Sequence, residues 1–305
     1  EDKQTKINEL KIHNLKTILK NILNNSNYNK IKRKIDYDIS NYFIKNIVLK
    51  DEKIVNNNYY SKILINFDKD KIIKFLRNEN LSYVEYIPED FLTIIYENKN
   101  ISKNLFSRKY NSHYKFLTLN KNLLNFYALP NFDINDRFLI NISDIENQNL
   151  EKINNFQNKY FYKNSLIIIV NENQNNIVYD IYLNTNNNMY LIKNFETIDY
   201  DYESFFTNLI PEVLDVWKTN NSIQNKNIFD IVCVITYFNL MELKEIKNNI
   251  KKISIIDEIK LKKISYKKNK YAIKYYGDQN ILYELFKINN LKIDINNEEC
   301  LIKLK

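Results

Sequence analysis

Glycine is nearly absent from this chain, with Gly277 the only one among 305 residues. Most tight turns need a residue with a positive φ angle, which glycine adopts at the lowest cost. Asparagine tolerates the same left-handed backbone, so we expect asparagine to form the turns instead. The asparagine runs at 56–58 and 186–188 are therefore predicted turns. A glycine-rich phosphate-binding loop is excluded in its usual form.

The amino-acid composition indicates a folded chain despite this bias. The sequence is 44% hydrophobic, with 24 tyrosines and 17 phenylalanines, and its apolar residues recur at regular spacing. We interpret the excess of Asn, Lys, Ile, Tyr and Phe as the codon bias of a very AT-rich genome. A chain of this length is expected to form two or three domains of about 100–150 residues each.

The clearest pattern lies in residues 228–304, where strand and helix signals alternate. A β-branched run predicts a buried strand, and Asn239 begins a helix with one apolar face. Two segments of alternating polarity then predict a hairpin, Gly277 supplies a turn, and Asp278 caps a second helix. LKIDI and CLIKL close the region as strands. This β-α-β-β-α-β order predicts a ferredoxin-like module at 223–305.

Two further modules of helices and strands are predicted, which makes the expected fold class α+β with small antiparallel sheets. Residues 1–97 begin with an amphipathic helix and continue as two strands, a short helix and two more strands. Residues 98–131 carry mixed signals and are interpreted as an irregular connection. Residues 132–222 combine a helix, a three-stranded meander and a second helix interrupted by Pro211.

The formal net charge of +8 admits two interpretations. A basic surface attracts nucleic acid, anionic lipid or acidic glycan. Lysine codons are also abundant in AT-rich genomes, and the lysines here are interspersed with acidic residues, which favours an ordinary solvated surface. No stretch approaches about 20 consecutive apolar residues, so no transmembrane segment is predicted.

The two cysteines, Cys233 and Cys300, lie in the first and last predicted strands of the C-terminal module. These strands are neighbours in a ferredoxin-like sheet, so a disulfide is possible. We expect instead two separate buried thiols that pack as small hydrophobic residues.

No constellation of residues predicts an enzyme. His13 and His113 are isolated from any nucleophile, and no Cys/His spacing fits a metal site. We therefore expect a non-enzymatic protein without catalytic, cofactor-binding or metal-binding residues.

The nearest approach to a chemical site is two pairs of carboxylates. Asp133 with Asp136, and Asp199 with Asp201, are spaced as calcium ligands can be, and an unrecognised hydrolase is a further hypothesis. Roles in turns and helix caps are commoner for such residues. We interpret Asp133, Asp136 and the adjacent Arg137 as candidate surface residues for a partner.

The C-terminal module has the element order of RNA recognition motifs, which stack bases on strand aromatics. Tyr271 and Tyr275 share one face of its third strand and are candidates for such a surface. The segment NKYAIKYY departs from that motif, because Lys270 replaces its glycine and Ile273 a central aromatic. Nucleic-acid binding as a ribonucleoprotein subunit is therefore kept as the alternative function.

Three segments together carry a family resemblance: YYSKILINFDKDKIIKFLRNENLSYVEY, DINDRFLINISDIENQNLEKINNFQNKYFYKNSLIIIV, and YYGDQNILYELFKINNLKI. They resemble an exported proteobacterial family of uncharacterised proteins known only as a domain of unknown function. In the first segment the matching positions are Tyr60, Leu64, Phe67, Asp68, Leu76, Arg77 and Tyr83. Residues 98–131 match that family poorly.

The resemblance implies a soluble periplasmic protein made with a signal peptide, and it implies no activity or cofactor. The chain begins at Glu1 rather than Met, which fits a removed signal peptide or a boundary chosen for the chain. The expected function is to bind or scaffold an unidentified protein partner in the envelope. A cytoplasmic or organellar location accompanies the nucleic-acid alternative.

Overall fold

The chain folds as two compact units. The computed structural model describes residues 3–55, 58–88, 90–99, 102–173, 176–224, 227–295 and 300–305. The first unit combines Glu1–Glu85 with Asn221–Lys305, and the second is Tyr86–Asn220. The second unit is thus inserted into a unit built from both ends of the chain. Helices pack on antiparallel and mixed sheets, which confirms the α+β fold class.

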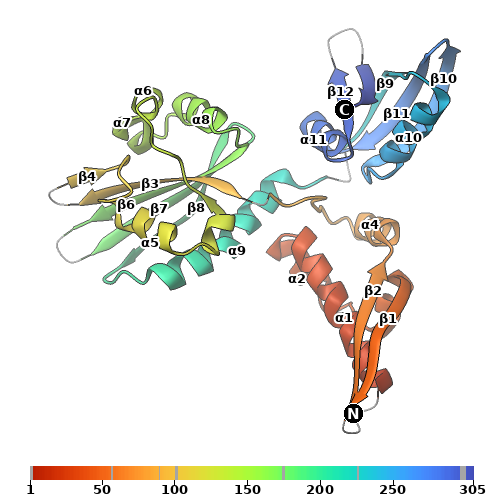
Figure 1. Cartoon of the computed structure of the whole chain (residues 1–305), viewed down its shortest axis with the longest axis horizontal. Coiled ribbons are helices and arrows are strands. Elements are labelled where there is room, and N and C mark those ends of the chain that lie inside the picture. Colours follow the sequence, from red (N-terminus) through yellow and green to blue (C-terminus); the bar gives the residue numbers. More distant parts are fainter. Residues whose placement is uncertain are drawn as a thin grey trace. The chain divides into compact units, whose positions relative to one another are not determined.

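The N-terminal part of the first unit packs helices beside a hairpin (Figure 1). Leu15 and Leu19 of its first helix are fully buried, as the helical spacing predicts. Asp68 caps the last helix by accepting a hydrogen bond from the Lys71 backbone N–H. The turn expected at 56–58 lies mostly outside the described residues. The elements are α1 (Lys3–Ile22), α2 (Asn25–Ile31), α3 (Tyr37–Phe43), β1 (Ile44–Val55), β2 (Asn58–Phe67) and α4 (Lys69–Asn78).

The C-terminal part of the first unit contains the predicted order of elements. Asn239 and Asp278 cap its two helices, as expected. The strand order is β10-β11-β9-β13-β12. A ferredoxin-like module is not confirmed, because β13 separates β12 from β9 and runs parallel to β9. The elements are β9 (Ile228–Thr236), α10 (Leu240–Lys251), β10 (Ile256–Ser265), β11 (Lys268–Tyr276), α11 (Gln279–Ile288), β12 (Leu291–Ile295) and β13 (Cys300–Leu304).

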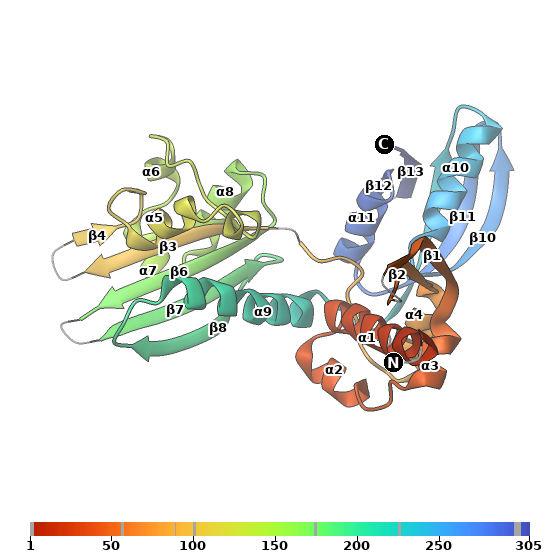
Figure 2. The ribbon, with the colours of Figure 1, turned by 60° about the horizontal axis from the view of Figure 1, so that its bottom comes forward.

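Helices α10 and α11 cover the same face of this sheet (Figure 2). Helix α10 joins the parallel strands β9 and β10 across β11, and α11 joins the parallel strands β11 and β12 across β9 and β13. Right-handed crossovers place both helices on one side. Cys233, Tyr271 and Ile273 face the helices and are buried. The alternate residues of each strand project from the opposite side, which we call the open face.

A polar cluster around Arg77 joins the two ends of the chain. The Arg77 guanidinium donates hydrogen bonds to the Tyr83 hydroxyl (3.1 Å) and the Ser254 carbonyl (2.8 Å). It also lies 4.0 Å from the centre of the Tyr276 ring. The buried Glu85 carboxylate accepts a hydrogen bond from the Ser254 backbone N–H. These contacts bind α4 to the C-terminal sheet, although the residues are far apart in sequence.

The second unit is built on a mixed sheet of order β4-β3-β6-β7-β8, with β5 paired to β3. Strands β3 and β6 are parallel, and β6, β7 and β8 form the predicted antiparallel meander. The elements are β3 (Phe91–Lys99), β4 (Ser102–Asn104), α5 (Ser112–Leu119), the 3-10 helix η1 (Leu123–Asn125), β5 (Tyr127–Ala128), α6 (Asp136–Leu139), α7 (Ile142–Glu146), α8 (Leu150–Lys159), β6 (Asn164–Glu172), β7 (Ile177–Thr185), β8 (Asn188–Thr197) and α9 (Tyr202–Asn221).

Helices cover both faces of this sheet (Figure 1). Helices α7 and α8 bury Ile145, Ile153 and Phe156 against one face. Helices α5 and α9 lie on the other face, where Phe206 and Val213 are fully buried. A sheet covered on both faces explains why β3 and β6 read as continuous apolar runs.

The unit boundaries differ from the sequence expectation. The boundary expected at residue 97 falls inside β3, which pairs with β6 rather than with the N-terminal hairpin. Residues 98–131, expected to be irregular, contain helix α5 and belong to the second unit. The boundary expected at 222 agrees closely with the return to the first unit at Asn221. Pro211 does not end α9, which continues through it.

Asparagine takes some of the positions with positive φ, as the scarcity of glycine predicts, and other residue types take the rest: Asp51, Phe132, Gln148, Phe161 and Lys267. Asn186 and Asn187 have φ angles of 50° and 57° in the turn between β7 and β8, which confirms the predicted turn at 186–188. Asn80 and Asn290, just after α4 and α11, also have positive φ. Gly277 has a φ of 88°.

Substitution of Gly277 tests this backbone requirement. An added Cβ meets Ile223 at 3.5 Å, an ordinary contact, so the left-handed backbone dominates the cost. We expect Gly277→Ala to lower the free energy of unfolding by about 1–2 kcal/mol, and Gly277→Asn to lower it less. Urea unfolding followed by circular dichroism measures both values. Equal stability of Gly277→Ala and the natural chain would contradict the prediction.

Candidate functional site

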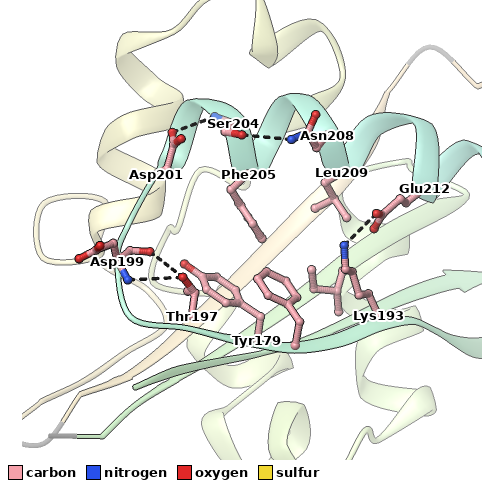
Figure 3. A pocket seen from close by; sticks show the side chains of 12 residues that line it. Tyr179, Lys193, Thr197, Asp199, Asp201, Ser204, Phe205, Asn208, Leu209 and Glu212 are labelled. Carbon is pink, nitrogen blue, oxygen red and sulfur yellow. Dashed lines mark hydrogen bonds and ion pairs between the residues drawn. The ribbon is translucent and has the colours of Figure 1, made fainter. Parts of the chain in front are cut away.

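A pocket of about 220 Å³ lies in the second unit, between α9 and strands β7 and β8 (Figure 3). Lys193 and Glu212 form an ion pair of 2.9 Å at one end. At the other end lie Asp199 and Asp201, one of the carboxylate pairs noted in the sequence. Asp201 caps α9 by accepting a hydrogen bond from the Ser204 backbone N–H (3.0 Å). The carboxylate of Asp201 thus has the structural role common for such residues.

Three aromatic rings form the wall of this pocket. The Tyr179 ring stacks on Phe195 with centroids 4.9 Å apart, and Phe205 lies 4.7 Å from Tyr179. Figure 3 shows the Phe205 side chain pointing from α9 toward the sheet that carries Tyr179. The rings that line the pocket therefore also pack on one another.

A buried chain of hydrogen bonds continues behind Tyr179. The Tyr179 hydroxyl lies 2.9 Å from Nε2 of His113, and Nδ1 of His113 lies 2.5 Å from Oε1 of Glu97. A carboxylate only accepts hydrogen bonds, so Nδ1 carries the proton and Nε2 accepts from Tyr179. The same carboxylate oxygen also accepts from the Ser112 hydroxyl and the His113 backbone N–H.

The environment fixes the protonation of each group in this chain. Burial alone would raise the pKa of the Glu97 carboxyl, but the hydrogen bonds from His113 and Ser112 lower it to about 2. Burial lowers the pKa of His113 below its usual value, although Glu97 opposes the shift. Burial also raises the pKa of the Tyr179 hydroxyl well above its usual range. At neutral pH this hydrogen-bonded group therefore consists of an ionised Glu97, a neutral His113 and a neutral Tyr179.

This arrangement favours a structural role over acid–base catalysis. His113 and Glu97 are fully buried, and both ring nitrogens of His113 have partners within the unit. Lys99, 3.6 Å from the second Glu97 oxygen, balances the buried charge. A general acid or base must reach a substrate proton, and His113 reaches none. These hydrogen bonds connect β3, α5 and β7 through Glu97, His113 and Tyr179.

Sequence reasoning missed the pairing of Glu97 with His113. The two residues lie 16 positions apart, on elements whose contact was not foreseen. One signal was present in the sequence. Glu97 directly follows six strand residues that are almost all apolar, and the structure buries all six. A charged residue in a buried strand requires a partner.

Asp133 and Asp136 are brought together as their spacing suggested, but a lysine lies between them. Lys159 Nζ is 2.6 Å from one carboxylate oxygen of each aspartate. The Tyr160 hydroxyl donates to the other oxygen of Asp136. Asp136 is fully buried, so the expectation that it is a surface residue for a partner is wrong. The ammonium group thus takes the position that a calcium ion would need. Within the described ranges no group of three or more His, Cys, Asp or Glu residues is placed to hold a metal ion.

Arg137 remains exposed, as a partner-binding residue must be. Its guanidinium lies 5.9 Å from the centre of the Phe106 ring. The neighbouring Ile134 and Phe138 are also exposed.

The expectation that Tyr271 and Tyr275 form a partner surface is wrong. Both are buried under α10 and α11, because odd-numbered residues of β11 face the helices. Lys247 of α10 lies 6.0 Å from the Tyr271 ring centre. The tyrosines belong to the core of the sheet, so they cannot stack on the bases of an RNA.

The open face of the C-terminal sheet is rich in lysine instead. Strand alternation and register place seven lysines there, against the carboxylates Asp230, Glu258 and Asp294. Val232, Val234 and Leu301 lie between the lysines, and Val232 is 47% exposed. The lysines are Lys260, Lys263, Lys268, Lys270, Lys274, Lys292 and Lys303.

The expectation of two separate thiols is also wrong. Cys233 of β9 and Cys300 of β13 form a disulfide, with Cα atoms 4.4 Å apart. Strand β13 runs beside β9 in the register that sets Cys300 opposite Cys233. Both side chains face the helices and are buried. The disulfide therefore links a central strand to the strand inserted beside it.

Comparisons with protein-family models, curated proteins and solved structures found no match to this chain. In the part of the chain that the structure describes, every helix is too short or too polar to cross a membrane. The resemblance to an exported family stays a prediction.

The buried histidine predicts a pH dependence of stability. The unfolded chain binds a proton at His113 below a pKa of about 6.5, whereas the folded chain resists protonation because burial lowers this pKa. Stability contributed by His113 is therefore present above pH 7 and is lost as pH falls toward 5, by at most about 1.4 kcal/mol per pH unit.

Proton NMR of the imidazole ring measures this effect directly. We expect the His113 signals to show protonation with a midpoint below the ordinary histidine pKa of about 6.5, because burial lowers the pKa of this imidazole. Protonation of His113 with a midpoint at or above pH 6.5 would contradict the assignment.

Proposed function

We propose that this chain is an exported, non-enzymatic protein of the periplasm that binds a protein partner in the envelope. The observation that carries the proposal is the open face of the C-terminal sheet, in which two strands are joined by a disulfide. The disulfide supports the location, and the open face supports partner binding.

The disulfide supports export because such bonds persist in oxidising compartments and are rare in the reducing cytosol. It closes a loop of 67 residues, for which a stabilisation of about 2–4 kcal/mol is typical. In the oxidising periplasm the disulfide persists, and so does the stabilisation that it gives.

The open face supports binding because a sheet is ordinarily covered on each apolar face by another layer. Here α10 and α11 cover one face, while Val232 (47% exposed) and Leu301 (39% exposed) remain accessible on the other. Exposed apolar residues rimmed by polar ones are typical of interaction sites. The fully buried His113 chain gives no comparable support for an enzyme.

Nucleic-acid binding is the second candidate, favoured by the lysines of the open face. Base stacking on aromatics is the usual basis of single-strand binding to a sheet. Among the described residues of the open face, Tyr276 is the one aromatic, and Arg77 already lies on its ring. The open face thus offers charge without a stacking platform, so a protein partner is preferred.

Thiol trapping in cells tests the location. In cells that carry the native gene, we expect the protein in the periplasmic fraction, with neither cysteine open to alkylation until a reductant is added. The buried disulfide between Cys233 and Cys300 is the physical reason. Recovery in the cytoplasmic fraction with both thiols alkylated would refute export.

Site-specific photo-crosslinking tests partner binding. A photo-reactive amino acid at Val232 is expected to form an adduct with an envelope protein, since this side chain is exposed on the open face. The same group at Lys244, exposed on α10, is the control. Equal yields from both positions, or no adduct from Val232, would count against this function.

A further inference from the structure

The open face has the shape and charge of a binding surface for one kind of partner. We infer that it binds an amphipathic helix whose apolar stripe is flanked on both sides by carboxylates. This inference rests on the proposed function, because it specifies the partner of the same surface.

An apolar strip runs along the middle of the open face. Val232 and Val234 lie on the central strand β9, and Leu301 lies opposite Val234 on the adjacent β13. A helix that packs on a sheet buries a stripe of residues spaced i, i+3, i+4 and i+7 against such a strip. The strip is the position that a helical layer would occupy in a sheet covered on both faces.

Lysines border this strip on two sides. Lys268 and Lys270 project from β11 on one side, and Lys303 projects from β13 on the other. Adjacent strands are about 4.8 Å apart, so β11 and β13 are separated by about 10 Å. An α-helix with its side chains is about 10–12 Å wide. A helix centred over β9 would therefore bring its two flanks within reach of the two sets of lysines.

The lysines also repel one another in the free protein. Lys263 is the cross-strand partner of Lys270, and Lys292 is the partner of Lys303. Like charges directly opposite each other destabilise a sheet. Lys292 has Asp294 at 3.3 Å, whereas Lys263, Lys270 and Lys303 form no ion pair with any described residue. Carboxylates of a bound helix would relieve both repulsions.

The acidic residues of the open face do not cancel this charge. Glu258 is paired with Lys260 at 2.7 Å, and Asp230 lies in the same row of the sheet as Glu258. That row is toward the end of the face where Arg77 covers Tyr276. At the opposite end Asp294 lies across from Leu301 and is paired with Lys292 at 3.3 Å, whereas Lys263, Lys270 and Lys303 pair with no described carboxylate.

Binding of a defined peptide tests this inference. The probe is a synthetic helix of about five turns with a leucine stripe and glutamate on both flanks, measured by fluorescence anisotropy on the full, oxidised chain. We expect saturable binding that weakens as salt rises, since the attraction is between exposed charges. A peptide with the same leucine stripe and lysine flanks is expected not to bind.

Two double variants locate the binding surface. Lys270→Glu with Lys303→Glu is expected to weaken peptide binding about tenfold or more. It is also expected to raise the thermal midpoint by about 1–4 °C, because both lysine–lysine pairs become opposite charges. Lys244→Glu with Lys287→Glu makes the same charge change on the exposed surfaces of α10 and α11, and should leave binding within about twofold. A merely structural role for Lys270 and Lys303 would not combine weaker binding with higher stability.

Four results would overturn the inference. They are no binding of the acidic peptide, equal binding of the lysine-flanked peptide, equal loss in both double variants, and tighter binding of a single-stranded oligonucleotide or of anionic vesicles. If the peptide fails while Val232 still crosslinks to an envelope protein, the partner is of another kind and the proposed function stands. If the peptide binds but the protein is found in the cytoplasm with reduced cysteines, the inference about the open face is supported and the proposed periplasmic function is refuted.

Discussion

The covalent bond between β9 and β13 is the constraint on which the C-terminal sheet depends. Strand β13 has five residues, and three of them pair with β9. Few backbone hydrogen bonds therefore hold β13 to β9. The disulfide fixes this short strand beside the central strand β9, where it separates β12 from β9. Leu301 and Lys303 reach the open face from β13. The composition of that face thus follows from a bond made on the opposite, buried side.

Each unit also contains a polar cluster that joins elements distant in sequence. In the first unit, Arg77 joins α4 to the C-terminal sheet through Ser254 and Tyr276. In the second, Glu97 and His113 join β3 to α5 and reach β7 through the Tyr179 hydroxyl. An unpaired buried charge costs several kcal/mol, so each cluster permits only the packing that supplies its partners. The clusters therefore select the arrangement of elements more than they add stability.

Regular apolar spacing predicts much of the fold, whereas contacts between distant segments escape it. The spacing predicts α1, α8, α9 and the β6–β7–β8 meander, and the structure contains each of them. Helix α5 is missed because eight residues give too short a period. The pairing of β3 with β6 is missed because a strand's pattern does not name its neighbour. The sequence placed Cys233 and Cys300 on neighbouring strands, but neighbouring strands alone do not set the register that brings Cys300 opposite Cys233. The exposure expected for Tyr271 and Tyr275 is wrong because the positions of the helices decide which strand face is buried.

The open face and the disulfide connect stability, redox state and binding in one sheet. Reduction would leave β13 held by its hydrogen bonds alone, while Lys303 and Lys292 continued to repel each other across β12 and β13. Carboxylates of the acidic helix inferred above would offset this repulsion. An oxidising compartment and an acidic partner favour the same arrangement of strands.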